Sequence, residues 1–347
     1  MAVSTSSLSL ATWAKQSNAP LIERVTKSLY ELDNIAQDVP FISRKTMEVT
    51  GSRFVGSLPA INWGQINLTP AVTTGEPTQY RESAWIIRNF IDVDEILRDD
   101  VNSIGDPMAQ QIMSYMAALT FDVNTKFINN DHITGNSQAI VGLKWRLNNP
   151  TSLGGFATIP SGSSAGTAQN LISSGQDLRL VNITSKTANA FLENVGQLLR
   201  QMKAPDGNGV VLYMNGYMYD RFTTSVRTAG SGAGWDTTVD DYGRVAVTFR
   251  GAILRDIGRQ SDQWTQIITE TENSDGTDTS SSTYTSIYGV KWGSETALGW
   301  QWEPFAAWPA FKTDDAVIDR TFLKWYWGLV FPDTYSVGRV YDINING

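Results

Sequence analysis

The sequence contains no cysteine and a single histidine, His132, among its 347 residues. Without cysteine the chain can form no disulfide and no thiolate nucleophile, and an intracellular origin is permitted without being required. One histidine cannot supply a Ser-His-Asp triad or a histidine-rich metal site within one chain, so we expect His132 at the surface or in a cap. The Gly-rich phosphate-binding patterns are also missing. The sequence therefore predicts no enzyme, no bound cofactor and no metal.

Charge and long apolar runs are scarce as well. Only 18% of the residues are charged, and the net charge is −8. An acidic chain is not drawn electrostatically to nucleic acid or to an anionic membrane. No apolar run is long enough to span a bilayer, and the N-terminus lacks the basic and apolar regions of a secretion signal. With 41% hydrophobic residues, the chain is expected to be a folded, soluble protein used without export.

Two acidic pairs and one acidic loop are the remaining candidates for chemistry. Residues 240–241 and 314–315 are Asp-Asp pairs, and glycoside hydrolysis uses paired carboxylates, with tryptophans as sugar platforms. Residues 275–278 have some calcium-loop residue types but lack the alternating ligand spacing and the closing glutamate. Acidic pairs usually lie in solvated turns. A carbohydrate-active enzyme is therefore kept only as the weaker alternative.

The longest regular pattern lies at residues 105–130. Asp106 is a good N-cap residue, and Pro107 suits the first helical position because the N–H that it lacks would have no partner there. Apolar residues then recur with the 3.6-residue period of a helix, at Met108, Ile112, Met116, Leu119, Val123 and Phe127. At about 1.5 Å per residue the helix would be roughly 36 Å long. We expect its apolar stripe to pack on a β layer formed by residues 245–292 and 321–343.

The segment before this helix, residues 46–92, is predicted to be a long β-hairpin that leads into an acidic helical turn at residues 92–100. Residues 46–59 and 78–94 are rich in β-favouring side chains, and their connection is dense in Gly, Pro, Asn and Thr. A long two-stranded ribbon normally needs a surface to lie on. Its tip carries apolar residues that would contact such a surface, namely Ile61, Trp63, Ile66 and Leu68. The surface is either a neighbouring subunit or the hairpin's own domain.

The rest of the chain mixes helices and strands and then turns to strands. Residues 1–18 lack periodicity and are expected to form a flexible arm, followed by a short helix that Pro40 ends. A helix at 187–203, a buried strand at 209–215 and a helix at 217–227 indicate an α/β unit. Four strands are expected towards the C-terminus, at residues 245–254, 263–270, 284–292 and 324–331.

In this order the elements resemble those of the major capsid protein of tailed bacteriophages, the Hong-Kong-97-like fold that encapsulin nanocompartments also use. The resemblance extends from about residue 20 to the C-terminus. Its best-matching segment contains the return of the hairpin and the long helix, WIIRNFIDVDEILRDDVNSIGDPMAQQIMSYMAALTFDVNTKFINND. Four later segments match in order and spacing, GVVLYMNGYMYDRF, VTFRGAILRDIG, TSIYGVKWGSETALGW and LKWYWGLVFPDTYSVGRVYDI. No segment is a strict signature, so the agreement rests on order and spacing together.

The resemblance implies an α+β fold with an N-terminal arm, an extended β-hairpin loop that lies on the adjacent subunit, a long spine helix, and peripheral and axial domains. The ranges are 1–45 for the arm with its short helix, 46–92 for the extended loop, 93–139 for the spine helix of the peripheral domain, 140–250 for the axial domain and 251–347 for a β-rich return to the peripheral domain. The expected assembly contacts are Arg53, Ile61, Trp63, Ile66, Leu68, Glu76, Tyr80 and Arg81.

The function implied by the resemblance is that of a structural subunit of an icosahedral capsid, built from hexamers and pentamers, that encloses a double-stranded DNA genome. The chain would assemble with itself in the host cytoplasm and reside in the virion capsid. Scaffolding, portal and decoration proteins would be further partners, the packaged DNA would be contacted non-specifically, and no membrane would be involved. Three alternatives stay open: an encapsulin-like shell, another virion protein such as a tail component, and a secreted carbohydrate-active or adhesive β protein.

The chain departs from parts of this family in two ways. Some members cross-link the subunits of their shells covalently, through an isopeptide bond between an asparagine and a lysine of the extended loop. Here no lysine occurs between Lys45 and Lys126. We therefore expect no such cross-link. Some members also carry a long N-terminal scaffolding segment, whereas the arm and hairpin here use nearly all residues before the long helix. Any scaffold is then a separate protein, or the sequence is the mature form.

Overall fold

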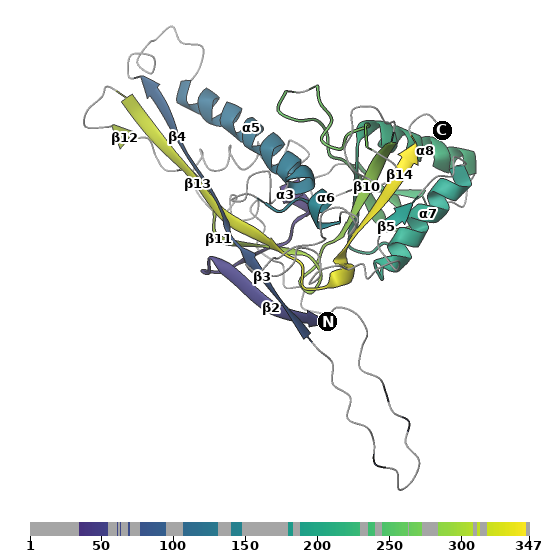
Figure 1. The fold of residues 1–347 in the computed structure, drawn as a ribbon. Coiled ribbons are helices and arrows are strands. Elements are labelled where there is room, and N and C mark those ends of the chain that lie inside the picture. The colour runs from purple at the N-terminus through teal and green to yellow at the C-terminus, as the bar shows by residue number, and fades with distance from the viewer. Residues whose placement is uncertain are drawn as a thin grey trace.

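The computed structural model describes residues 35–54, 61, 63, 69, 77–94, 107–130, 140–147, 180–182, 188–229, 235–239, 245–262, 264–272, 284–307, 311–312 and 318–344. The strands among them form a five-stranded sheet, a seven-stranded sheet and a separate two-stranded hairpin. Figure 1 shows the two larger sheets on either side of the long helix α5 (Pro107–Asn129), with the hairpin projecting away from both.

The five-stranded sheet is built around the 13-residue strand β13 (Ile318–Val330). This strand pairs antiparallel with β4 (Trp85–Asp94) on one side, and with β11 (Leu298–Ala307) and the short β12 (Phe311–Lys312) on the other. β1 (Phe41–Ser43) adds parallel to β11. Side chains of β4 and of most of β13 alternate between more and less buried, which is the pattern of strands with one covered face.

The long helix predicted from the apolar period is present as α5, and it begins at Pro107 as expected. Its apolar stripe is buried at Ile112, Met116, Leu119, Val123 and Phe127. These side chains share one core with the buried tryptophans of β4 and β13. Near the C-terminal end of the helix, the Phe127 ring lies 5.7 Å from the ring of Tyr213 and 6.1 Å from that of Trp292. The predicted β layer is therefore confirmed in part. Residues from both predicted ranges pack on the helix, and β4, which the prediction did not include, belongs to the same layer.

The seven-stranded sheet has the order β5-β14-β10-β6-β9-β8-β7. Its strands are β5 (Leu180–Asn182), β6 (Val210–Met214), β7 (Trp235–Val239), β8 (Val245–Phe249), β9 (Ala252–Asp256), β10 (Tyr284–Lys291) and β14 (Val337–Asn344). The predicted helices α7 (Ala188–Gln201) and α8 (Gly216–Ala229) share a core with alternate residues of β6. Val211 and Tyr213 of β6 belong instead to the core of α5. Both faces of β6 are therefore covered, as its apolar run predicts.

This sheet combines segments that the sequence placed in different domains. β9, β10 and β14 all lie within residues 251–347, the expected β-rich return to the peripheral domain. In the structure β9 and β10 pair with β6, and β14 pairs with β10. The sheet therefore has no boundary at residue 250. Three short elements complete the description, α3 (Ile35–Asp38), α6 (Leu143–Arg146) and the 3-10 turn η1 (Thr334–Ser336).

Two local predictions of strands and helices are wrong at their boundaries. Residues 245–254 form two strands instead of one, because Arg250 and Gly251 take positive φ angles of 50° and 84°. Two consecutive residues at positive φ make the tight turn of a two-residue hairpin, which joins β8 to β9. Residues 92–94 continue β4 and do not begin a helix.

The strand predicted at residues 263–270 is also absent from the described part of that segment. The carboxylate of Asp262 accepts hydrogen bonds from the backbone N–H groups of Trp264 and Thr265. The pKa of Asp262 is lowered, chiefly by the hydrogen bond from the Thr265 hydroxyl and then by these two N–H groups. A side chain that binds its neighbours' backbone in this way competes with strand pairing, so the apolar residues of the segment do not decide its structure.

Candidate assembly surfaces

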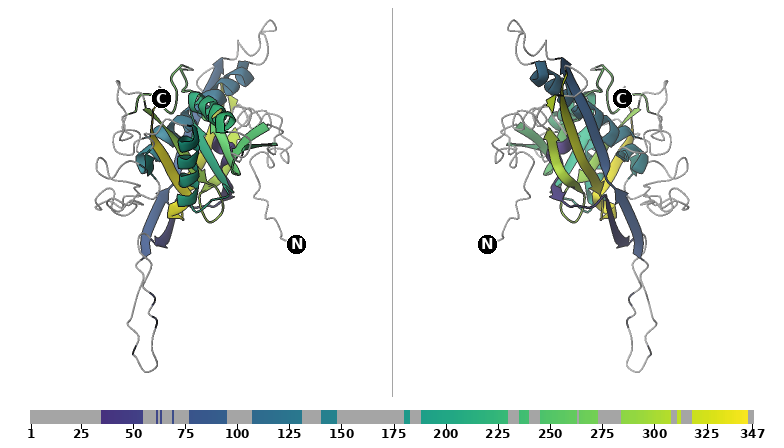
Figure 2. Two further views of the ribbon diagram at one scale, coloured as in Figure 1. Left: turned by 90° about the vertical axis from the view of Figure 1, so that its right-hand side faces the viewer. Right: turned by 90° about the vertical axis from the view of Figure 1, so that its left-hand side faces the viewer.

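The predicted hairpin is present as β2 (Glu48–Phe54) and β3 (Pro77–Ser83), which pair antiparallel along their whole length. It forms its own sheet and projects from the body of the molecule (Figure 1, Figure 2). The return segment is two strands and not one. At Ala84, whose N–H donates to the carbonyl of Met47 (2.8 Å), the chain leaves the hairpin and enters the five-stranded sheet as β4.

The root of the hairpin is fixed by two side chains that face each other across its strands, Val49 and Glu82. Val49 is buried in a small apolar cluster with Leu298, Trp300 and Val330 of the five-stranded sheet. The buried carboxylate of Glu82 accepts one hydrogen bond from each terminal nitrogen of the Arg146 guanidinium, Nη1 at 2.7 Å and Nη2 at 2.9 Å. An apolar contact and an ion pair therefore hold the same end of the ribbon to the body.

The predicted assembly residues fall into three groups. Ile61 and Trp63 are 81% and 94% exposed, so neither side chain is covered by the subunit's own domain. Backbone pairing places Arg53, Tyr80 and Arg81 together in the ribbon β2–β3. The others lie outside the described residues, as do the candidate chemical groups: Ile66, Leu68, Glu76, His132, and residues 240–241, 275–278 and 314–315. Of the predicted arm with its short helix, residues 1–45, residues 1–34 lie outside them as well.

Sequence reasoning missed a second surface, the outer face of β4 and β13. On this face four pairs of residues lie directly opposite one another: Ile86 and Tyr326, Arg88 and Lys324, Phe90 and Phe322, and Asp92 and Arg320. Ile86 is 44% exposed and Phe90 55% exposed, whereas their neighbours Trp85 and Ile91 are buried on the α5 side. The face thus presents two apolar pairs separated by a pair of cations.

Contacts along this face hold the side chains in place. The rings of Phe90 and Phe322 lie 5.0 Å apart, and the Arg320 guanidinium lies 5.0 Å from the centre of the Phe90 ring. Arg320 also donates two hydrogen bonds to the carboxylate of Asp92, at 2.7 and 2.8 Å. The bond from Arg320 lowers the pKa of Asp92. Tyrosine and arginine, both present on this face, are among the residues that most often dominate binding energy in protein interfaces.

The alternation in residues 85–94, WIIRNFIDVD, contained a signal for this face. A period of two indicates which residues share a face of a strand. It does not tell which of the two faces a helix of the same chain covers, because that depends on where α5 packs. The exposed face is therefore visible only in the folded chain.

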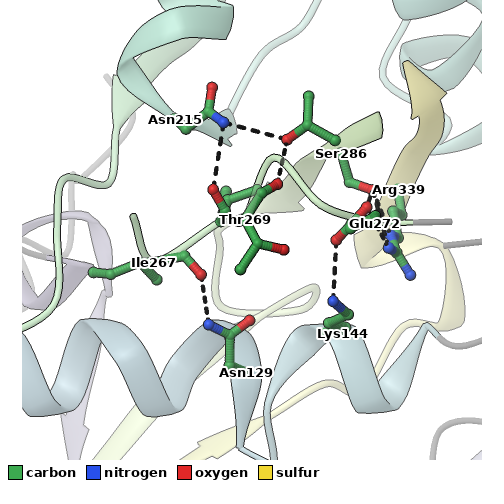
Figure 3. A network of polar contacts seen from close by, with 10 residues as sticks. Asn129, Lys144, Asn215, Ile267, Thr269, Glu272, Ser286 and Arg339 are labelled. Atoms are coloured by element: carbon green, nitrogen blue, oxygen red, sulfur yellow. Dashed lines mark hydrogen bonds and ion pairs between the residues drawn. The ribbon is translucent and has the colours of Figure 1, made fainter. Parts of the chain in front are cut away.

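Away from both surfaces, a buried polar network links α6 to the seven-stranded sheet (Figure 3). The carboxylate of Glu272 accepts hydrogen bonds from Lys144 of α6 (3.1 Å), from Arg339 of β14 (3.0 Å) and from the hydroxyl of Ser286 on β10. In the same view, the side-chain amide of Asn129 at the end of α5 donates to the carbonyl of Ile267. These groups hold α5, α6 and the sheet together by mutual pairing.

A second buried network surrounds Tyr213 of β6. Its hydroxyl donates to Asp38 of α3 (3.0 Å) and accepts from the indole N–H of Trp292 (3.0 Å). Asp38 also accepts a hydrogen bond from Arg255 of β9 (3.1 Å). Burial, together with the nearby charge of Asp38, raises the pKa of Tyr213 well above its usual value. The network ties α3 to the sheet and keeps this phenol neutral.

Within the part of the chain that the structure describes, no three potential ligands gather as a metal site would require. No helix in the same residues is both long enough and apolar enough to cross a membrane.

Comparison with known sequences finds no matching family model and no matching curated protein. Solved structures do match. The capsid of a native GTA particle superposes with a TM-score of 0.53 at 11% identity, covering 90% of each chain. The holo-SrpI encapsulin of Synechococcus elongatus PCC 7942 has a TM-score of 0.52 at 11% identity, covering 89% of this chain and 86% of that one. A structure from Microbacterium phage Oxtober96 has a TM-score of 0.50 at 11% identity, covering 88% and 89%.

These matches confirm the resemblance at the level of the fold. The chain has the mixed α+β, Hong-Kong-97-like fold of capsid and encapsulin proteins.

Proposed function

We propose that this chain is the structural subunit of a closed shell built from copies of itself, and that the shell is a phage capsid enclosing double-stranded DNA. The observation that carries the proposal is the combination, in one subunit, of a projecting hairpin with exposed apolar side chains and an exposed sheet face on which apolar pairs alternate with charged pairs. The likeness in fold to a particle capsid and an encapsulin supports it.

In this proposal the hairpin of one subunit lies on the outer face of β4 and β13 in the next. The connection between β2 and β3, residues 55–76, contains a single charged residue, Glu76. Such a segment fits the apolar pairs around Phe90 and Ile86 better than it fits a charged surface. Because each copy would donate one hairpin and accept another, the contact is head-to-tail, and a suitable rotation between neighbours closes it into rings.

We further propose that the seven-stranded sheet with α7 and α8 surrounds the centres of hexamers and pentamers, and that the five-stranded sheet with α5 forms the periphery. The role is structural and not catalytic, because the buried ionisable groups that the structure describes, such as Glu272, Arg339 and Asp38, are paired with one another in networks that connect elements. The shell would assemble in the host cytoplasm, with scaffolding, portal and decoration proteins as further partners.

An encapsulin-like shell is the second candidate, favoured by the match to the SrpI encapsulin. The two candidates differ in content. Particles isolated from the native source should contain nuclease-protected double-stranded DNA if the shell is a capsid, and protein cargo without such DNA if it is an encapsulin.

Electron microscopy of the purified protein tests the common proposal. Closed particles of uniform diameter are expected, and a protein that stays monomeric at every concentration would refute it. Deleting residues 60–77 should leave a folded, soluble subunit that forms no closed particles, since the described tip residues Ile61 and Trp63 contribute little to the subunit's own core. Particles of normal size from this deletion would contradict the role given to the hairpin.

A further inference from the structure

The hairpin is attached to the body by an unusual contact, a buried bidentate ion pair. The side chain of Arg146 is 0% exposed and that of Glu82 is 6% exposed. Arg146 donates from Nη1 and Nη2 to the two carboxylate oxygens, and from Nε to the carbonyl of Val141 (3.0 Å). Its guanidinium also lies 4.8 Å from the centre of the Phe331 ring. The Arg146 group is thus held in one plane by contacts on its edge and on its face.

Stability alone does not account for such a pair. Removing two charges from water costs free energy that their attraction repays only in part, and apolar side chains of similar volume often serve stability as well or better. What a bidentate pair adds is direction, because two parallel hydrogen bonds fix the carboxylate plane relative to the guanidinium plane. The neighbouring contact of Val49 is apolar and imposes no comparable direction.

Arg146 lies at the end of the short helix α6, which is itself held in place by neighbouring elements. The N–H of Gly142 donates to the carbonyl of Asn130 (3.0 Å), and the side-chain amide of Asn130 donates to the carbonyl of Ile140 (2.7 Å), so α6 is joined to the end of α5. Lys144 of α6 binds Glu272, which joins the helix to the seven-stranded sheet. The guanidinium that holds the hairpin is therefore fixed relative to α5 and to the seven-stranded sheet.

Small changes at this root are magnified along the ribbon. A seven-residue strand such as β2 is about 20 Å long, so a tilt of about 10° at the root would move its far end by roughly 3.5 Å. A shift of that size removes apolar side chains from contact with a facing surface.

We propose that Glu82 and Arg146 are positioning residues that set the angle at which the hairpin leaves the subunit, and thereby the angle between neighbouring subunits in the assembled shell. The second half of this inference rests on the proposed function, and the first half concerns the isolated subunit alone. The pair acts through orientation of the hairpin and need not touch the neighbouring subunit.

The absence of cysteine makes the angle measurable in the free subunit. Ser52 on β2 and Ser114 on α5 are both exposed, so Ser52→Cys and Ser114→Cys provide two nitroxide-labelling sites without competing thiols. Pulsed electron paramagnetic resonance then reports the distribution of distances between hairpin and body. The original pair should give one narrow population, and both Arg146→Met and the uncharged double variant Glu82→Gln/Arg146→Met should give a broader distribution with a shifted mean.

The matched control is Arg255→Met. This substitution also removes an arginine from a long-range ion pair, whose other member is Asp38, but Arg255 lies on β9 of the seven-stranded sheet and not at the root of the hairpin. It should leave the distance distribution narrow. If Arg146→Met fails to fold because Glu82 is left buried without its partner, the double variant, which buries no lone charge, supplies the measurement. Distributions that stay narrow and unshifted in the folded Glu82 and Arg146 variants would overturn the proposal.

An assembly assay tests the angle between subunits separately from the hairpin angle in the free subunit. If the original chain forms no particles, the proposed function fails while the distance measurement still judges the hairpin angle. If it forms closed particles, the double variant should form particles of mixed diameter or open sheets. Particles of unchanged, uniform diameter from the double variant would refute the link between the hairpin angle and the angle between subunits.

Discussion

Phe90 on β4 and Phe322 on β13 lie directly opposite each other on the outer face of the five-stranded sheet, with their ring centres 5.0 Å apart. Phe90 is 55% exposed, although the next residue along the strand, Ile91, is buried in the core that α5 shares. An aromatic ring held by a partner ring and by the Arg320 guanidinium loses little side-chain freedom when a second surface covers it. Such a ring is well suited to be an anchor between subunits.

Phe90→Ser should therefore weaken assembly much more than it weakens the subunit. We expect the free energy of unfolding to fall by no more than about 1 kcal/mol, the range of a cross-strand pair. The concentration needed to form particles should rise by about tenfold, which corresponds to about 1.4 kcal/mol. Light scattering against concentration measures it. Met113→Ser on α5 is the control, because Met113 is also 55% exposed but lies on the other side of the sheet. Equal effects of the two substitutions would contradict the assignment of the face.

Gly142 is required by the close approach of two backbone segments. A Cβ atom at this position would lie 2.6 to 2.8 Å from backbone atoms of Ile128 and Asn130, which cannot move independently of α5. Gly142→Ala should therefore cost about 1–3 kcal/mol in the free energy of unfolding, the usual penalty of overpacking. Urea denaturation measures this loss.

Gly196→Ala provides the contrast for that measurement. The nearest atom to a Cβ at Gly196 is Nη1 of Arg250, the flexible end of an exposed side chain. Because Gly196 lies within α7, alanine there should stabilise the helix by about 0.5–1 kcal/mol once the arginine moves aside. A loss at Gly196 as large as that at Gly142 would show that the backbone contact is not the deciding factor.

The ion pair of Glu272 and Arg339 should contribute to stability in a way that the exposed pair of Asp92 and Arg320 does not. Both side chains of the first pair are 1% exposed, so Arg339→Met leaves the buried Glu272 with only Lys144 and Ser286 as partners. We expect a loss of about 3 kcal/mol, measured by chemical denaturation. Arg320→Met is the control and should have little effect, because water screens the exposed charges. Losses of similar size in both variants would contradict this difference.

Local pattern was sufficient where one segment determines its own structure. The period of the apolar residues predicted α5, and the turn-rich segment between two β-favouring runs predicted the hairpin β2–β3. It failed where structure depends on one residue's conformation. Residues 247–254, VTFRGAIL, resemble one continuous strand, and the positive φ angles of Gly251 and of Arg250, a residue type that rarely adopts one, divide them.

The attachment of the hairpin was beyond local pattern for a different reason. Glu82 and Arg146 are 64 residues apart in sequence, and neither lies in a distinctive motif. Charged residues are mostly exposed, so a sequence predicts each of them at the surface. Their burial follows from the packing of β3 against α6, which no periodicity in either segment encodes. The same holds for Phe90, whose exposure depends on which face α5 covers.

Tyr213 should make the folded subunit sensitive to alkali. Its pKa is raised by burial, so the folded chain keeps the phenolic proton at a pH where the unfolded chain releases it, above about 10. The unfolded state then binds fewer protons, and the stability present below that pH is lost as pH rises. Tyr213→Phe should lower stability by about 1–3 kcal/mol at neutral pH, because Asp38 and Trp292 lose a partner. Its stability should also fall less steeply above about pH 10.

Urea midpoints at neutral pH and at about pH 10.5 measure both effects, since the second lies above the ordinary tyrosine pKa. The exposed Tyr217, replaced by phenylalanine, is the control and should resemble the original chain at both values. An alkaline loss of stability that is unchanged in Tyr213→Phe would show that another group is responsible.

The extended loop should form no covalent bond to a neighbouring subunit. An isopeptide bond requires a lysine amine within reach of an asparagine side chain, and no lysine occurs between Lys45 and Lys126. Lys126 itself lies on α5, where its amine is 2.7 Å from the carboxylate of Asp122. Particles boiled in denaturing detergent should therefore run as a single band at the monomer mass of 38.2 kDa, even after prolonged ageing. A ladder of covalent multimers would contradict this prediction and would direct attention to the lysines outside the loop.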